Sequence, residues 1–531
     1  MDTRNAFSPL SLFLTLMLLA GSLPQAYWIT RSRDELVTQT VMDDAFYYFQ
    51  TSRNVAQGAG SVSAGGVEHN GYHPLWMLVC AGFFRGAPDD LTAIRLILLF
   101  GVVLELLAAL VVYRILLQLR CTRASALFGA ACFHLNPWMQ ILTVCGLEAP
   151  LNAFLLALTT FTTLRVTDSQ CPGQSAGYRS WLFLGVLMGL TYLVRTDNVF
   201  YLGATVLLVG WQMRQRRASF RGLVTACFLA GLLILPWTLW NWHTFGSLVQ
   251  GSASALPSIR KIAFFQEHPG ASGWTFTLYR LKLLGGWFPA LLYYSGLGSL
   301  WFVLLAAVCG ALVFRRGRAL GGHVARAFVN LMPLALAVLT LGIAHKFFRL
   351  ATREWYYVTP NLFLALLSGG VAHLLIPLIS EFQGRGNHFV HRLPLVAACL
   401  VFLLLGYKTW NSAQERLARP RSFFLEILEA FEAQPDLRPG EMFGITDSGT
   451  VGFFSSHPAL NLDGVVNPEA ADAIRKGDLL AYVRSKGIRY LVITPRMFNA
   501  RFWGEDFARY LEPYPPLTPQ GYHLKDEPLA P

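Results

Sequence analysis

The order of hydrophobic and polar residues divides the chain into two parts. Up to Lys408, apolar runs of about 20 residues recur, and each is long enough to cross the ~30 Å hydrocarbon core of a bilayer. Beyond Lys408 these runs stop and polar residues become frequent. The pattern predicts an α-helical polytopic membrane protein with about eleven transmembrane helices. The predicted spans cover about residues 8–30, 91–113, 124–143, 149–164, 181–194, 198–213, 222–241, 290–314, 327–344, 356–378 and 393–408.

Composition agrees with this class. Apolar and aromatic residues make up 54% of the chain, and only 14% of residues are charged, against about a quarter in soluble domains. The first apolar run continues past Ala20-Gly21-Ser22 to Ile29, so we expect an uncleaved first span and no signal peptide. The eight cysteines are scattered without a CxxC pair, which indicates neither a disulfide framework nor a zinc site.

One apolar segment, residues 73–84, has only about 12 residues, too few to cross, and suits a re-entrant or interfacial position. If it does not cross, the densest arginine clusters all fall on one side of the membrane. The positive-inside rule then places the N-terminus inside and the C-terminus outside. The clusters lie at residues 114–123, 214–221, 315–326 and 385–392. The net charge of +12 therefore reflects membrane orientation, and nucleic acid is not an expected partner.

After Lys408 the sequence predicts a small soluble domain. A polar helix is expected over residues 412–433, strands over 442–446, 459–466 and 489–494, and a second helix over 468–486. Alternating strands and helices are typical of an α/β domain. We therefore predict a membrane domain over residues 1–408, with a functional first outer loop (31–90), and a soluble α/β domain on the outer face over residues 409–531.

Three chemically rich segments share the predicted outer face: the first outer loop, the loop from about 242 to 289, and residues 345–357. The first loop contains Asp43-Asp44 followed by an aromatic run. Crowded or buried carboxylates have raised pKa values, so one of the pair is a candidate general base. The alternatives are that the pair binds a divalent cation such as Mg or Mn, or that it only caps a surface helix.

The order of these motifs resembles the GT-C superfamily of membrane glycosyltransferases, which includes protein O-mannosyltransferases, aminoarabinose transferases and arabinofuranosyltransferases. The resemblance rests on an Asp-Asp-Ala-aromatic run after the first span, the Asn70-to-Trp76 segment, Gly-Leu-Glu at 146–148 and Arg-Thr-Asp at 195–197. It implies a polyprenyl-phosphate-linked sugar donor, a catalytic aspartate in the first outer loop, and inversion at the anomeric carbon. Asp44 is the expected base because its spacing to Arg53 resembles that of the family; Asp43 is the alternative.

Four further polar residues of the predicted outer segments, Glu148, Arg195, Asp197 and His73, are candidates for the site. Glu148 stands where such proteins often have a second acidic residue, and is predicted to orient the acceptor or sugar hydroxyls; a carboxylate favoured by a helix dipole is the alternative. Asp197 either pairs simply with Arg195 or forms part of the active-site floor. His73 either contacts the sugar or phosphate, or is an ordered interfacial histidine.

A cationic segment on the outer side opposes the positive-inside bias and is the candidate site for the donor phosphate. Arginine is suited to this role because its planar fork binds phosphate oxygens bidentately. Arg353 is the first candidate, followed by Lys346 and Arg349, with Tyr356 beside them. The alternative is contact with anionic lipid head groups.

The sequence thus predicts an inverting, polyprenyl-phosphate-sugar-dependent glycosyltransferase, a hexosyl- or pentosyltransferase, of a cell envelope. We expect it in the bacterial inner membrane, in contact with membrane lipids, with a glycolipid, polysaccharide or protein as acceptor. A transporter or flippase of lipid-linked sugars is the alternative, and it predicts charges within spans; Glu105 is the main example. A non-catalytic scaffold would leave the outward clustering of charged residues unexplained.

Overall fold

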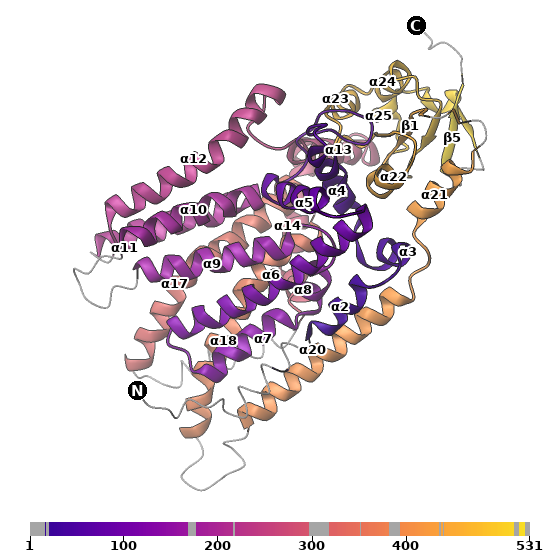
Figure 1. Ribbon diagram of the computed structural model, residues 1–531. Coiled ribbons are helices and arrows are strands. Elements are labelled where there is room, and N and C mark those ends of the chain that lie inside the picture. Colours follow the sequence, from indigo (N-terminus) through magenta and orange to yellow (C-terminus); the bar gives the residue numbers. More distant parts are fainter. Residues whose placement is uncertain are drawn as a thin grey trace.

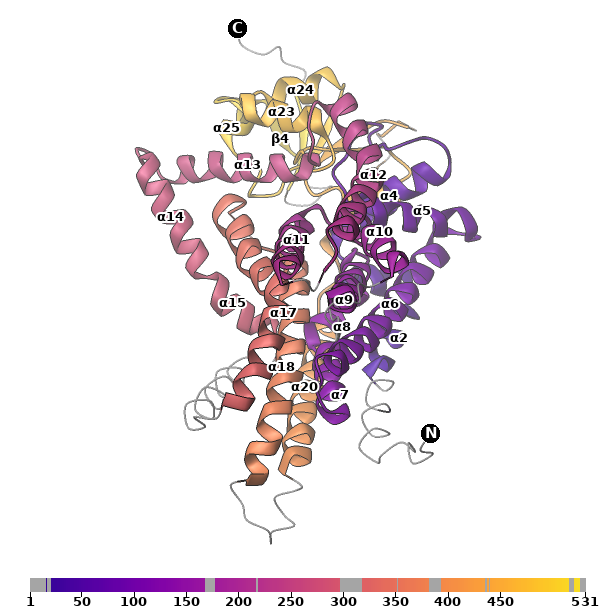
Figure 2. The same ribbon diagram turned by 90° about the vertical axis from the view of Figure 1, so that its left-hand side faces the viewer.

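The computed structural model describes residues 16, 21–167, 177–215, 218–296, 318–350, 352–381, 393–434, 437–438, 440–514 and 520–525. Figure 1 shows a long bundle of helices with the small sheet domain at one end, and Figure 2 shows the same arrangement from the side. The two-part architecture predicted from hydropathy is therefore observed.

Five helical stretches among the described residues are long and apolar enough to cross a membrane, and the protein is an integral membrane protein. They are Asp90–Gln118 (α6), Ala149–Thr167 (α9), Phe220–Phe245 (α12), Val329–Phe348 and Glu354–Leu374. The last two belong to α17 (Arg318–Gly342) with η3 (Ile343–Phe348), and to η4 (Glu354–Tyr357) with α18 (Val358–Glu381). The predicted number of about eleven is not confirmed. Most of the span predicted at 290–314, and the first half of the one at 8–30, lie outside the described residues.

Other predicted spans form shorter helices. These are α10 (Tyr178–Val194), α11 (Val199–Arg214) and α2 (Leu23–Ile29). The prediction of one helix over 124–143 is wrong: α7 (Arg123–His134) ends before α8 (Pro137–Thr143) begins. Asn136 causes the break, because its side-chain oxygen accepts a hydrogen bond from the Trp138 N–H at 2.8 Å and caps α8. Pro137 then occupies the first helical position, where its missing N–H costs nothing.

The first outer loop is largely helical. It contains α3 (Arg33–Glu35), η1 (Leu36–Thr40), α4 (Asp43–Ala56) and α5 (Pro74–Gly86). The α5 helix is the apolar segment that was predicted not to cross. Its 13 residues span only about 20 Å at 1.5 Å per residue, which is too short for the hydrocarbon core.

The segment expected to be a loop over 242–289 is also helical. The α12 helix continues to Phe245, and α13 (Gly251–Glu267), α14 (Gly273–Gly285) and α15 (Trp287–Tyr294) follow. In Figure 2, α13 lies across the bundle beneath the sheet domain, and α14 descends from it beside the membrane helices. The α13 and α14 helices mix polar and apolar residues and contain no long apolar run, so hydropathy alone did not separate them from a loop.

The C-terminal domain contains a five-stranded sheet in the order β2-β1-β3-β5-β4. The strands β2 (Ala459–Asn461), β1 (Phe443–Ile445) and β3 (Tyr490–Val492) are parallel, while β5 (Gly521–Leu524) pairs antiparallel with β3 and with β4 (Leu511–Pro513). The three predicted strands are present, and β4 and β5 were not predicted. Helical elements of the domain are α21 (Phe423–Glu432), α22 (Gly449–Phe454), α23 (Pro468–Lys476), α24 (Leu479–Ser485), α25 (Ala500–Trp503) and η6 (Phe507–Tyr510).

The limits of two helices predicted for this part of the chain are wrong. The one expected over 412–433 is divided between α20 (Leu393–Leu417), which continues from the membrane, and α21. The one expected over 468–486 is divided into α23 and α24 by Gly477, which has a φ of +73° and ends α23 in the left-handed conformation.

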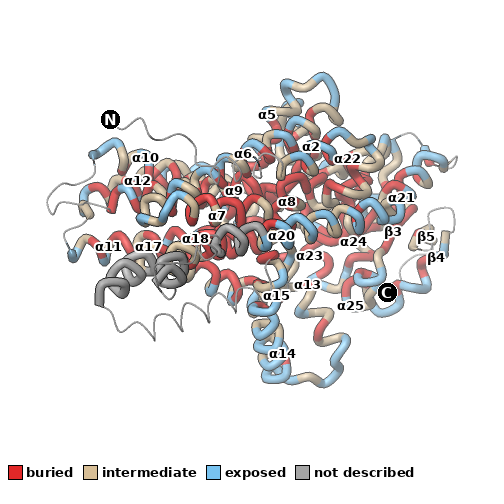
Figure 3. Tube along the Cα trace, turned by 90° about the horizontal axis from the view of Figure 1, so that it is seen from below, coloured by how far each residue is buried: buried red, intermediate tan, exposed pale blue. Residues whose placement is uncertain are grey.

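The largest buried core joins the two parts of the molecule. It contains apolar residues of α4, α5, α6 and α9 together with Leu425, Leu428 and Phe453 of the C-terminal domain. The rings of Phe46 and Phe453 are 5.6 Å apart. Figure 3 shows buried residues along the middle of the bundle and into the sheet domain. The domain is therefore packed onto the helices rather than attached only by the chain.

Glu105 is a charged residue buried within α6. Its carboxylate accepts a hydrogen bond from the Gln25 amide at 2.6 Å and lies 3.3 Å from Nδ1 of His134. All three side chains are almost completely buried. The neighbouring helices thus supply polar partners for the mid-span charge, as a carboxylate inside a membrane requires.

Candidate active site

A polar cavity of about 130 Å³ lies between the ends of the membrane helices and the C-terminal domain. We call it the polar cavity. Four carboxylates and five guanidinium groups line it, so its charge is mixed rather than of one sign. These residues are Asp44, Glu148, Asp447 and Asp463, with Arg195, Arg260, Arg349, Arg353 and Arg496. Tyr47, Tyr48, Tyr72, His73, Gln250, Trp355 and Tyr356 also line it.

The structure separates the two aspartates of the first outer loop. Both lie in the first turn of α4, yet only Asp44 lines the polar cavity. The Asp43 carboxylate instead accepts hydrogen bonds from the backbone N–H groups of Gly449 (3.2 Å) and Thr450 (2.7 Å). Asp43 therefore fastens α4 to the C-terminal domain, and Asp44 is the one open to a ligand.

The surroundings of Asp44 suit a proton acceptor. Burial raises the pKa of Asp44 to about 6, against the lowering effect of the nearby Arg353 guanidinium. Asp447 and Glu148 add negative charge and raise the pKa further. A carboxylate whose pKa lies near 6 is mostly ionised at neutral pH and is still a better base than an ordinary aspartate.

Glu148, Arg195 and Asp197 form a buried charge network at the bottom of the polar cavity. An Arg195 Nη donates to Glu148 at 2.5 Å, and the other groups of its guanidinium donate to Asp197 at 2.7 and 3.0 Å. Nε2 of His345 lies 3.0 Å from the second Asp197 oxygen. Burial raises the pKa of Asp197, but the Arg195 and His345 side chains hold it well below the usual range. Asp197 is thus an ion-paired residue behind the wall, and it does not line the cavity.

His73 lies beside this network. Its Nε2 is 3.9 Å from Glu148, and its Nδ1 accepts a hydrogen bond from the Thr196 N–H at 3.4 Å. Burial lowers the pKa of His73 to about 4, against the raising effect of Glu148. The imidazole is therefore neutral at physiological pH and lies in the cavity wall.

The predicted cationic segment is divided by the structure. Arg349 and Arg353 line the polar cavity with Tyr356, whereas Lys346 does not. Arg349 donates to the Tyr356 hydroxyl and to the Ser252 carbonyl, each at 3.2 Å. Arg353 stands over the Trp355 ring at 6.0 Å. Lys346 lies in η3, within a stretch long and apolar enough to cross the membrane.

Arg260 lies close enough to Arg349, Arg353 and Arg496 for their charges to affect it. Burial, and then the positive charges of Arg496 and Arg353, lower the pKa of Arg260 to about 10. Arg260 belongs to α13, Arg353 to the segment before η4 and Arg496 to the C-terminal domain. Carboxylates of the same cavity offset part of this charge, since Asp447 lies 3.9 Å from Arg496 and the charge of Arg353 acts on Asp44. We call Arg260, Arg353 and Arg496 the arginine cluster and regard it as a candidate anion site, because guanidinium groups bind phosphate oxygens well.

Sequence reasoning missed the cavity residues of the C-terminal domain: Asp447, Asp463 and Arg496. Each follows the carboxyl end of one parallel strand, since β1 ends at Ile445, β2 at Asn461 and β3 at Val492. Ligands of α/β domains bind outside the carboxyl ends of such strands. Part of the signal was present in the sequence, because Asp447 and Arg496 follow the strands predicted over 442–446 and 489–494, whereas Asp463 fell inside the strand predicted over 459–466.

The contact between α4 and the C-terminal domain is very close. The Tyr47 hydroxyl accepts a hydrogen bond from the Ser448 N–H at 3.0 Å, and Arg53 donates to the Phe453 carbonyl at 3.0 Å. Two glycines permit this approach. A Cβ atom on Gly449 would lie 2.1 Å from the Asp43 carbonyl oxygen, and one on Gly71 would lie 2.2 Å from that of Val465. Residues of both the membrane part and the C-terminal domain therefore form the cavity.

The donor set does not match a metal centre. Among the described residues, no three His, Cys, Asp or Glu side chains are grouped so that they could hold a metal ion. The positive charges of Arg353 and Arg496 act on Asp44, and a cation bound there would be repelled by them. The possible Mg or Mn site suggested by the Asp43-Asp44 pair therefore receives no support from the geometry.

Comparison with known proteins identifies the fold. The oligosaccharyltransferase of Archaeoglobus fulgidus in its apo form matches with a TM-score of 0.58 at 13% identity, over 91% of this chain and 69% of that one. The same enzyme, AglB, in complex with an inhibitory peptide and a dolichol-phosphate matches with a TM-score of 0.54 at 14% identity, over 97% and 75%. ArnT of Cupriavidus metallidurans bound to undecaprenyl phosphate matches with a TM-score of 0.54 at 14% identity, over 91% and 93%.

These structures have the GT-C fold, and the chain therefore has this fold, as its motifs predicted. Residues 419–527 match a family described as a domain of unknown function, DUF8728. A comparison with the sequences of curated proteins gives no match.

Proposed function

We propose that the protein is an inverting glycosyltransferase that moves a sugar from a polyprenyl-phosphate donor to an acceptor hydroxyl. One observation carries the proposal: a half-buried carboxylate with a raised pKa, Asp44, opens into the same cavity as the arginine cluster. A base beside an anion site is what direct displacement of a sugar from a phosphate requires.

The proposed reaction is a single displacement. Asp44 takes the proton of the acceptor hydroxyl as its oxygen attacks the anomeric carbon. The new glycosidic bond forms on the face opposite the departing phosphate oxygen, so the anomeric configuration inverts. The bond between the sugar and the phosphate breaks, and the polyprenyl phosphate leaves with the electron pair. Arg353, Arg260 and Arg496 stabilise the negative charge that develops on this phosphate.

The membrane-side residues orient the substrates in this scheme. Glu148, held by Arg195 at 2.5 Å, accepts hydrogen bonds from hydroxyl groups of the sugar or acceptor. Arg349 and Tyr356 line the cavity next to each other and contact the sugar phosphate, and His73 contacts the sugar as a neutral imidazole. Asp197 and the Asp43 carboxylate act at a distance, by holding Arg195 and the C-terminal domain. We assign no donor contact to Lys346.

Two features of the related folds support a lipid-linked donor. AglB was solved with a dolichol-phosphate and ArnT with undecaprenyl phosphate. We propose that the polar cavity and the domain of residues 409–531 lie on the outer face of a bacterial inner membrane, because the positive-inside rule assigns the arginine clusters of the sequence to the inner side. The acceptor is then a component of the cell envelope.

The test measures sugar transfer and sugar release from a panel of radiolabelled polyprenyl-phosphate hexoses and pentoses, with purified protein in nanodiscs. We expect turnover of one donor, and a loss of about 10²–10⁴-fold for Asp44→Asn. Asp43→Asn is the matched control, because it removes the same charge one residue away. We expect a loss of about tenfold or less, since the amide oxygen still accepts one of the two backbone hydrogen bonds and the other is worth about 1 kcal/mol.

Circular dichroism and thermal unfolding are measured for both variants to establish that each is folded. If Asp43→Asn abolishes turnover while Asp44→Asn retains it, the assignment of the base is wrong. If the wild-type protein turns over no donor even with crude envelope extract as acceptor, the proposed function fails.

A further inference from the structure

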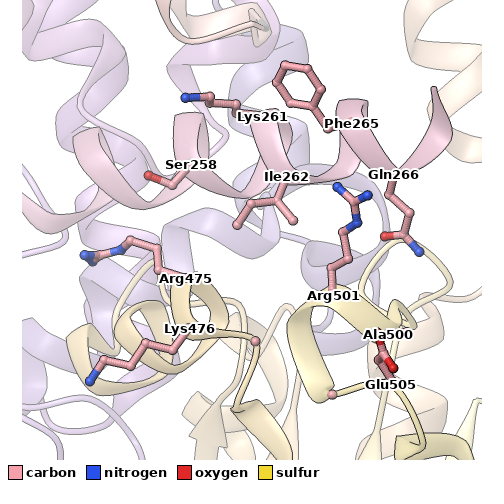
Figure 4. Close-up of a pocket in the computed structure, with 12 residues that line it drawn as sticks. Ser258, Lys261, Ile262, Phe265, Gln266, Arg475, Lys476, Ala500, Arg501 and Glu505 are labelled. Carbon is pink, nitrogen blue, oxygen red and sulfur yellow. The ribbon is translucent and has the colours of Figure 1, made fainter. Parts of the chain in front are cut away.

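A second opening lies between α13 and the C-terminal domain, on the other side of α13 from the polar cavity. Its volume is about 830 Å³, which lies within the range of about 300–1,000 Å³ that is usual for ligand sites. Figure 4 shows it between the α13 helix and helices α23 and α25. We call it the basic groove. It is lined by Ser258, Lys261, Ile262, Phe265 and Gln266 of α13, and by Arg475, Lys476, Gly477, Ala500, Arg501, Gly504 and Glu505 of the domain.

The charge of the basic groove is strongly positive. Four of its lining residues are cationic, namely Lys261, Arg475, Lys476 and Arg501, and one, Glu505, is anionic. In Figure 4 Arg501 extends from α25 toward α13. The cations come from three separate helices, so the charge is a product of the tertiary structure and not of one basic run in the sequence.

Helix stabilisation explains only part of this charge. Arg475 and Lys476 occupy the last turn of α23, where cations favourably oppose the helix dipole, and Arg475 also pairs with Asp472 at 2.9 Å. Lys261 and Arg501 belong to other helices and do not serve that dipole. Because Lys261 and Arg501 line the same groove, both can contact one bound anion.

The walls of the basic groove are fixed by packing. Ile259 of α13 is buried in the core of the C-terminal domain, and Ile262 packs against the same core. Gly477 approaches α25 so closely that a Cβ atom there would lie 3.0 Å from the Arg501 carbonyl oxygen. The groove is thus a built feature with a bottom of ordered helices, not a gap between loosely placed parts.

The α13 helix separates the basic groove from the polar cavity. Arg260 lines the cavity, and the next residue, Lys261, lines the groove. A helix with its side chains is about 10–12 Å across, which is the length of two or three sugar units. A chain held in the groove therefore lies close to the cavity where Asp44 and the arginine cluster meet.

We propose that the basic groove binds the acceptor, and that this acceptor is an anionic glycan carrying phosphate or carboxylate groups. This inference rests on the proposed function. Arginine and lysine side chains bind the acidic groups, while Ile262 and Phe265 offer apolar surface to the faces of the sugar rings. All residues that line the groove belong to α13 or to the C-terminal domain, and Figure 2 shows α13 between this domain and the membrane helices. We therefore favour a glycan chain over a lipid head group as the ligand.

The test is a binding measurement that does not need turnover. Fluorescence anisotropy follows three labelled oligosaccharides of equal length, namely an oligogalacturonate, a phosphorylated oligomannoside and a neutral dextran, added to the full chain in zwitterionic nanodiscs. We expect the two anionic chains to bind and the neutral one to bind much less. The triple variant Lys261→Gln, Lys476→Gln, Arg501→Gln weakens anionic binding by about tenfold, as expected for three partly exposed ionic contacts, and reduces its dependence on salt.

The matched control is Arg419→Gln, Arg438→Gln, Lys486→Gln, which removes the same charge from residues that do not line the groove. It should change binding by less than about twofold. Equal binding of the neutral chain, or equal losses in the two triple variants, would overturn the proposal. So would groove-dependent binding of liposomes containing anionic lipid in the absence of any glycan binding, because the ligand would then be a head group.

The outcome is independent of the catalytic test. Glycan binding that depends on the groove, in a protein that turns over no donor, would contradict the proposed function but leave the anionic-glycan site in place. Donor turnover without groove-dependent glycan binding would contradict this inference alone.

Discussion

The two walls of the polar cavity are built differently. The membrane-side wall is made of groups that are paired with one another: Glu148 and Arg195 are only 2–3% exposed, and their ion pair measures 2.5 Å. In the domain-side wall, the Arg496 side chain is 48% exposed and lies 3.9 Å from Asp447. Asp447 itself has a φ of +61°, a strained conformation for a residue other than glycine.

This difference separates groups that keep the shape of the site from groups whose charge is available to a ligand. A buried ion pair cannot lose one member without leaving the other uncompensated. A half-exposed guanidinium can exchange water for phosphate at little cost to the fold. Substitutions in each wall should therefore differ in their effects on stability and on turnover.

The largest effect is expected from Arg195→Leu. The change leaves Glu148 and Asp197 buried without their main partner, and breaking a buried pair in this way costs about 3–5 kcal/mol. Thermal unfolding of the purified protein in nanodiscs measures the loss. The double variant Arg195→Leu, Glu148→Leu should recover part of the stability, because one of the two uncompensated charges is then removed. Wild-type stability in the single variant would show that the network does not hold the wall.

Arg496→Leu should have the opposite effect, weakening donor binding while leaving the stability of the protein nearly unchanged. We expect the KM for the lipid-linked donor to rise by about tenfold to a hundredfold, since a charge-assisted hydrogen bond is worth about 1.5–3 kcal/mol. Unfolding should be nearly unchanged because the side chain is half exposed. Arg484→Leu, in the same domain but outside the cavity, is the control for kinetics. A large loss of stability with an unchanged KM would place Arg496 among the structural residues.

Gly449→Ala tests whether the walls must touch. The added Cβ atom would lie 2.1 Å from the Asp43 carbonyl oxygen, so the domain must shift, at a cost of about 1–3 kcal/mol. We expect lower stability, faster proteolysis around residues 418–422 and reduced turnover. Gly82→Ala is the matched control, since nothing lies within 4 Å of that position. Lower stability and faster proteolysis with unchanged turnover would mean that the docked arrangement is not needed for activity.

The smallest expected effect is that of pH. The pKa of Asp44 is raised to about 6, and a base must be ionised to accept a proton. The rate at low donor concentration should therefore fall by about tenfold from pH 7 to pH 5 and level off above neutrality. An Arg353→Leu variant removes the charge that lowers the Asp44 pKa, so its profile should move to higher pH. A profile independent of pH over this range would exclude Asp44 as the base.

Much of the fold was readable along the chain. Long apolar runs identified the membrane part, alternating strands and helices identified the α/β domain, and the Asp-Asp, Gly-Leu-Glu and Arg-Thr-Asp motifs indicated the GT-C fold. The limits of the elements were less predictable. Asn136 and Pro137 divide one apolar run into two helices, and α13 and α14 occupy a segment that hydropathy left as a loop. In both cases local capping and amphipathic packing overrode the average hydrophobicity.

For the candidate site, too, some features could be predicted from the sequence and others could not. The sequence by itself determined that the protein enters a membrane, and it indicated Asp44, Glu148, Arg195 and Arg353 as site candidates, because hydropathy and short motifs are properties of neighbouring residues. Only the tertiary structure decided that Asp43 faces Thr450, across 407 positions, and that Arg496 lines the same cavity as Arg260 and Arg353. These contacts depend on how a separate domain docks onto the helices, through close approaches at Gly71 and Gly449. Docking is a matter of shape complementarity between distant surfaces, and no local pattern in the chain encodes it.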